Sequence, residues 1–136
     1  MGVSFLYEIM NFFLENGMKV ILHCEKNTKV VKVGVVVNQG SVNENENNNG
    51  ISHFIEHILI IRSKSSPKLS NYYELLSVFG ASYSAITYKS HTVYYISGLS
   101  QGINTYLNLL KEIVFCFWQH KFLAVRNLIF RAPLSH

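Results

Sequence analysis

Five consecutive residues, His53 to His57, constrain the fold more than any other part of the chain. They read His-Phe-Ile-Glu-His, so two histidines stand four residues apart and a glutamate directly precedes the second. At about 100° per residue in an α-helix, His53, Glu56 and His57 fall within an arc of roughly 100°. The apolar residues of this segment are expected to cluster on another face: Ile51, Phe54, Ile55 and Ile58. The stretch predicts an amphipathic helix with one polar face and one packed face.

The residue types on the polar face are those of a zinc site. Neutral imidazoles are common ligands of Zn²⁺, and the cation lowers the pKa of a coordinated water to about 7. His53 and His57 are therefore the predicted zinc ligands, and Glu56 is the predicted general base that takes a proton from that water. The alternative is a buried helix that carries two histidines by chance.

The order His-x-x-Glu-His is that of the inverzincin motif, and its surroundings resemble the N-terminal domain of the insulinase and pitrilysin (M16) zinc peptidases. Residues 14–20 and 34–41 are similar to the first two strands of that family, and residues 50–52 lead into the motif as they do there. Three further segments are also similar: Phe79 to Ala81, Ala85 to Thr87 and Thr92 to Tyr95. The resemblance covers residues 12–115.

The resemblance implies an α+β fold, with a mixed or antiparallel sheet and helices packed on one face. It implies peptide-bond hydrolysis by zinc-activated water, with Glu56 as the base and Zn²⁺ as the cofactor. It also implies a peptide substrate and a C-terminal half or partner subunit, because family members need a second part to close a chamber around the peptide. Residues 1–115 are expected to form the M16-like domain, and residues 116–136 a divergent tail, truncated or frameshifted.

The third zinc ligand has no clear counterpart in this sequence. In the M16 family it is a glutamate on a later helix, roughly 70 to 80 residues after the second histidine. That distance leads to residues 127–136 here, which contain no carboxylate. Glu112 is expected on the exposed side of a helix, and His120 and His136 do not fit the family pattern. Because a catalytic zinc usually has three protein ligands, the second hypothesis is an inactive M16-like scaffold, partner subunit or gene remnant.

Composition narrows the remaining classes of protein. A length of 136 residues with 49% hydrophobic content predicts one domain. The formal charge of +4 comes from scattered Lys and Arg residues, so nucleic-acid binding is not expected. No run reaches the roughly 18 apolar residues of a membrane-spanning helix, and the first 14 residues do not have the pattern of a signal peptide. Cys24 and Cys116 form neither a CxxC motif nor a disulfide framework, which predicts a reducing, cytoplasmic location.

Local patterns predict the other elements of the first half of the chain. Residues 5–14 are expected to be an apolar lead-in that packs on the domain and ends in a turn. Residues 18–23 and the valine-rich residues 30–38 are predicted to be neighbouring strands. Residues 41–49 are predicted to be a solvated loop in which Glu44 and Glu46 are solvated charges, and Asn49 or Ser52 is the expected helix cap.

The second half of the chain is predicted to contain two helices and a hairpin. The helices are expected over residues 70–79 and 102–115, and the hairpin strands over residues 82–89 and 92–97. Pro133 is expected to interrupt any helix over residues 122–130. Because residues 117–136 lack every acidic residue, they are expected to pack poorly and to exchange their amide hydrogens quickly.

Overall fold

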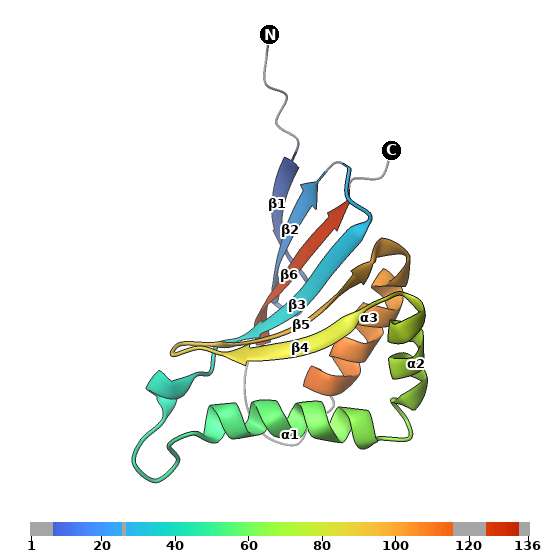
Figure 1. Ribbon diagram of the computed structural model, residues 1–136. Helices are drawn as coiled ribbons and strands as arrows, with labels where there is room; N and C mark the ends of the chain where they lie inside the picture. Colours follow the sequence, from blue (N-terminus) through green and yellow to red (C-terminus); the bar gives the residue numbers. More distant parts are fainter. Residues whose placement is uncertain (1–6, 26, 116–124, 134–136) are drawn as a thin grey trace.

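The computed structural model describes residues 7–25, 27–115 and 125–133, and Figure 1 shows their arrangement. The elements in chain order are β1 (Tyr7–Phe13), β2 (Lys19–Glu25), β3 (Val30–Val37), α1 (Ile51–Ser65), α2 (Ser70–Val78), β4 (Ser82–Thr87), β5 (Thr92–Leu99), α3 (Ile103–Leu110) and β6 (Val125–Pro133). Short 3₁₀ turns occupy Ser41–Asn43 and Ser100–Gly102, and a π-helical turn, Lys111–Phe115, follows α3. The two helices and the hairpin predicted for the second half of the chain are present.

The described strands form one six-stranded sheet in the order β1-β2-β6-β3-β5-β4. The β2–β6 pair is parallel, and the β1–β2, β3–β5, β3–β6 and β4–β5 pairs are antiparallel. The three helices gather against the β3–β5–β4 part of the sheet (Figure 1). The predicted α+β class, with a mixed sheet and helices on one face, is confirmed.

The core lies between the helices and the valine-rich strand β3. Alternate residues of a strand point to the same face of a sheet, and the four alternate valines of β3 are all buried: Val31, Val33, Val35 and Val37. Tyr94 and Ile96 of β5 join them from the neighbouring strand, and Tyr106, Leu109 and Leu110 cover them from α3. Each such apolar side chain contributes roughly 1.5–3 kcal/mol when fully buried, so this layer fixes the position of the helices on the sheet.

The packed face of α1 differs from the predicted one. Ile51 and Phe54 are 37% and 58% exposed, whereas the buried residues of the helix are Ser52, Glu56, Leu59 and Ser63. Polar groups can be buried when they are hydrogen-bonded. The Ser63 hydroxyl donates to the Ile60 carbonyl at 2.8 Å and lies 2.5 Å from the Tyr73 hydroxyl. Apolar periodicity therefore predicted the packed face only in part: Ile55 packs against the core, whereas Ile51 and Phe54 are exposed.

The expected lead-in is a strand. Residues 7–13 form β1, which pairs antiparallel with β2 from Tyr7 opposite Glu25 to Phe13 opposite Lys19. The Gly17 N–H closes the predicted turn by donating to the Leu14 carbonyl at 2.9 Å. The strand lies at the edge of the sheet, and its side chains from Glu8 to Phe13 are exposed.

Residues 125–133 lie in the segment with predicted poor packing, and their backbone pairs with two strands of the sheet. They form β6, which inserts between β2 and β3 and pairs with both, with Val20 opposite Leu128 and Val35 also opposite Leu128. A strand in this position satisfies backbone N–H and C=O groups on both of its neighbours. A helix over residues 122–130 is likewise excluded for the part from Val125 onward. Cys116, His120 and His136 lie outside the described residues, and the proposed domain boundary at residue 115 stays a prediction.

Within the described ranges, no helix combines the length and the apolar character needed to cross a membrane.

Candidate functional site

The two histidines of the motif lie one turn apart on the exposed side of α1. Their Nε2 atoms are 2.8 Å apart, and the rings stack with centroids 4.5 Å apart and an interplanar angle of 27°. Zn–N bonds of about 2.0–2.1 Å in a tetrahedral site place two ligand nitrogens roughly 3.3 Å apart. A small rotation of either ring would increase the distance between the two Nε2 atoms to that value. The arrangement therefore offers two nitrogen donors to one cation.

Glu56 lies on the buried side of α1, although it directly precedes His57. Its side chain is 7% exposed, and its Oε2 accepts a hydrogen bond from the Thr87 hydroxyl of β4. The motif is thus divided between two environments, with the imidazoles open to solvent and the carboxylate at the contact between helix and sheet. Thr87 has no predicted role in the sequence, because the hydrogen bond joins residues 31 positions apart.

Two tyrosines, buried Tyr94 and half-buried Tyr83, lie in the electrostatic field of Glu56. Burial, and next the negative charge of Glu56, raise the pKa of Tyr94 above its ordinary value. Burial also raises the pKa of Tyr83, with smaller contributions from Tyr94, Tyr73 and Glu56. Both phenols are therefore neutral at physiological pH, so neither adds a charge near the carboxylate.

The start of α1 is capped by a residue that the sequence did not indicate. The Gly50 and Ser52 N–H groups donate to Glu44 Oε2 and Oε1 at 2.6 and 2.8 Å. Neither Asn49 nor Ser52 is the cap, since Gly50 occupies the N-cap position and makes no side-chain bond. The Ser52 side chain, followed by the backbone N–H groups of Ser52 and Gly50, holds the pKa of Glu44 below its ordinary value. The prediction that Glu44 is merely a solvated charge is wrong.

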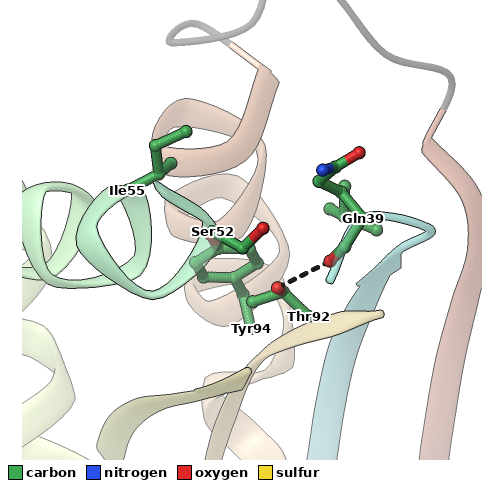
Figure 2. Close-up of a pocket in the computed structure, with 6 residues that line it drawn as sticks. Gln39, Ser52, Ile55, Thr92 and Tyr94 are labelled. Atoms are coloured by element: carbon green, nitrogen blue, oxygen red, sulfur yellow. Dashed lines mark hydrogen bonds between the residues drawn. The ribbon is translucent and has the colours of Figure 1, made fainter. Parts of the chain in front are cut away.

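The loop that carries Glu44 is fastened to the turn of the β4–β5 hairpin. The Val42 N–H donates to the Lys89 carbonyl at 2.9 Å, and the Thr92 hydroxyl donates to the Gln39 carbonyl at 2.9 Å (Figure 2). At Gly40 the two backbones approach so closely that a Cβ would lie 2.4 Å from the Tyr88 carbonyl oxygen. The hairpin therefore holds the site at two points. It is bonded to the loop that leads into α1, and its Thr87 is bonded to Glu56.

A small pocket lies between the start of α1 and the sheet. Figure 2 shows residues that line it, among them Ser52 and Ile55 of α1 and Tyr94 of β5. Its cavity volume is about 10 Å³. That is roughly the space of one water molecule, whereas pockets for small ligands usually measure about 300–1,000 Å³. This pocket is therefore too small to hold a peptide side chain.

The described residues do not complete a three-ligand metal site. No group of three or more His, Cys, Asp or Glu side chains in the described ranges is placed to hold one ion. Glu112 is engaged elsewhere, because its Oε2 accepts a hydrogen bond from Lys68 Nζ at 2.7 Å. His91 stacks on Tyr88 at the hairpin turn, with ring centroids 4.8 Å apart. His53 and His57 thus fit two positions of a zinc site, and the third donor is not among these residues.

Comparison with known proteins identifies the family to which the chain is similar. A family model described as Insulinase (Peptidase family M16) matches residues 19–122. The mitochondrial-processing peptidase subunit beta of Dictyostelium discoideum is 31% identical over 101 residues, which are 74% of this chain and 21% of that protein. The uncharacterized zinc protease YmxG of Bacillus subtilis (strain 168) is 27% identical over 124 residues, which are 90% of this chain and 30% of that protein.

The fold agrees with the sequence comparison. The crystal structure of a protease from Helicobacter pylori superposes with a TM-score of 0.66 at 28% identity, covering 79% of this chain and 26% of that one. The chain therefore spans less than a third of the length of each of these three proteins. The family model matches well over half of the chain and includes the His-x-x-Glu-His segment. The chain belongs to the insulinase family of peptidases, family M16.

Proposed function

We propose that this chain is the part of an M16 metallopeptidase that supplies two zinc ligands and the general base for peptide-bond hydrolysis. The observation that supports the proposal is the placement of the His53 and His57 Nε2 atoms 2.8 Å apart on the turn of α1 that also carries Glu56, whose carboxylate is held in the α1–β4 contact. When bound there, Zn²⁺ would supply Lewis-acid polarisation and a water of lowered pKa.

Glu56 has the features of a base with a fixed orientation. Its Oε2 is occupied by the Thr87 hydroxyl, which leaves Oε1 as the proposed proton acceptor. A carboxylate that is nearly buried and hydrogen-bonded does not have to be reorganised when it takes up a proton. Thr87 acts in this proposal as a positioning residue, since it touches the base and not the substrate.

A peptide substrate has a natural docking edge on β4. This strand is the last in the sheet, so its outer N–H and C=O groups are free of a neighbouring strand within the described residues. Extended peptides bind to such edges by adding a strand. Because Thr87 stands at the end of β4 and contacts Glu56, a peptide paired with β4 would lead toward the histidines.

The second candidate function is a scaffold or partner subunit of the same family without catalysis of its own. It is favoured by the lack of a third metal donor among the described residues and by the pairing of Glu112 with Lys68. Two imidazoles hold zinc weakly, so the chain alone is expected not to cleave peptides at a measurable rate. A C-terminal half or partner subunit would supply the missing donor and the opposite wall of the site.

Zinc titration of the wild-type chain beside His57→Ala and Glu56→Gln tests the ligand assignment. The wild type should bind Zn²⁺ weakly, His57→Ala should lose most of that affinity, and Glu56→Gln should keep it. Equal affinity of the wild type and His57→Ala would show that the metal binds elsewhere.

A fluorogenic peptide library, with Zn²⁺ added, separates the two candidate functions. Zinc-dependent turnover by the lone chain that is lost in Glu56→Gln would establish an active enzyme. No turnover, followed by activity after addition of a partner chain, would assign it as one part of a divided site.

The cytoplasmic location is part of the proposal as well, and buried, free Cys24 is compatible with it.

A further inference from the structure

Glu44 replaces the side-chain cap that the first turn of α1 lacks. The first four N–H groups of a helix have no partner within the helix. Gly50, at the N-cap, has a φ of 85° and no side chain to accept them. Glu44 takes two of the N–H groups at this end, one from Gly50 and one from Ser52. Its negative charge also interacts favourably with the helix dipole.

The residue capped by Glu44 adjoins the first proposed metal ligand. Ser52 immediately precedes His53 in the first turn of α1, whereas His57 lies one turn further into the helix. End turns of helices open at low free-energy cost when their N–H groups lack partners. His57 is therefore fixed by the helix body, and the position of His53 depends on how well the first turn is held.

The loop presents Glu44 from a fixed position. The Gly40 N–H donates to Asn43 Oδ1 at 3.2 Å, and the Asn45 N–H donates to Asn48 Oδ1 at 2.5 Å. The Val42 N–H holds the same loop to the hairpin turn at Lys89. Glu44 is thus connected through backbone bonds to the hairpin that also carries Thr87.

We propose that Glu44 is a positioning residue of the metal site. By fixing the first turn of α1, it holds the His53 imidazole opposite that of His57, although its carboxylate contacts neither ring. Metal affinity then depends on a loop carboxylate outside the His-x-x-Glu-His motif. The metal part of this inference rests on the proposed function, and the positioning of His53 does not.

The experiment compares Glu44→Gln with Glu46→Gln in the full chain. Glutamine keeps the size of the side chain but removes the charge and one acceptor oxygen. Glu46 is an exposed residue of the same loop, so its substitution makes the same change in net charge without removing the cap. Amide hydrogen exchange and the NMR signals of both imidazoles are followed without metal, and Zn²⁺ is then titrated into each protein.

In Glu44→Gln, exchange at Ser52 and His53 should become roughly fivefold faster, an effect of the size expected for a lost helix cap. Exchange at Leu59 should not change, and the His53 ring signals should shift more than those of His57. Zinc affinity should fall by a similar factor of roughly five, because the same opening removes one donor. Glu46→Gln should match the wild type in every measurement.

Two results would overturn the inference. Unchanged exchange at Ser52 and His53 in Glu44→Gln would show that the cap does not hold the turn. Equal acceleration at Leu59 and in β3 would show a general loss of stability in place of local positioning. If the wild type binds no zinc at all, the proposed function fails, while the exchange and ring signals still decide the role of Glu44.

Discussion

Replacing Thr87 by valine tests whether a hydroxyl on the sheet holds the proposed base. Valine has nearly the same shape as threonine, so the change removes the donor to Glu56 Oε2 and little else. A hydrogen bond to a charged group is worth about 1.5–3 kcal/mol, and a buried charge left without it also loses its compensation for desolvation. Since Glu56 is only 7% exposed, we expect Thr87→Val to lower the free energy of unfolding by about 2–3 kcal/mol.

Thr87→Ser is the matched control, because it keeps the hydroxyl and removes one methyl group. It should cost about 0.8 kcal/mol or less. Both variants are measured by urea denaturation at pH 7 and then repeated in a Glu56→Leu background, where no carboxylate remains to be held. In that background Thr87→Val should lower the free energy of unfolding by less than about 0.5 kcal/mol. The coupling energy between Thr87 and Glu56 is then at least about 1.5 kcal/mol.

Two results would contradict the proposed role of Thr87: equally small losses of stability in Thr87→Val and Thr87→Ser, or the same loss in Thr87→Val with and without Glu56. Either result would mean that Thr87 contributes through packing alone and that the base is oriented by other groups.

Two further predictions concern the frame of the site. Gly40→Ala should destabilise the protein by about 3 kcal/mol or more in urea denaturation. The reason is that the new Cβ would lie 2.4 and 2.5 Å from the backbone oxygens of Tyr88 and Lys89. A loss of stability as small as that of Ser41→Ala would contradict this close approach. Burial raises the folded-state pKa of Tyr94 and Tyr83 above the unfolded value, so stability should be full below a pH of about 10 and fall as the pH rises above it. Unfolding measured between pH 8 and 11 should show this decline, and Tyr94→Phe should make it shallower; an unchanged slope would argue against a buried phenol.

Much of the fold was predictable because its signals are local. The high content of β-branched valine predicted β3, helical spacing predicted α3, and the His-x-x-Glu-His spacing predicted that the two imidazoles would meet on one turn. β6 was not predictable, because its strand state depends on open edges of β2 and β3 that are distant in sequence.

The same limit explains what was missed in the site. The partner of Glu56 lies 31 residues away, and the cap of α1 comes from a loop whose composition indicates only solvation. Burial of Glu56 was missed because apolar periodicity does not indicate a polar group that is paired with a residue distant in sequence. Local chemistry thus identified which residues could bind a metal, and tertiary contacts decide how they are held.

The place of β6 in the sheet also sets the order in which the protein can assemble. Among the described strands, the β1–β2 hairpin joins β3, β5 and β4 only through β6, and on that side of β2 Lys19 pairs with Asn127. Pairings between such distant residues slow folding, because the entropy of closing a long loop is lost before the contact forms. A growing chain that has not reached residue 125 therefore carries two separate sheet fragments with open edges. Such edges promote aggregation, so the growing chain is expected to be more prone to aggregation before β6 has been synthesised than after it has paired.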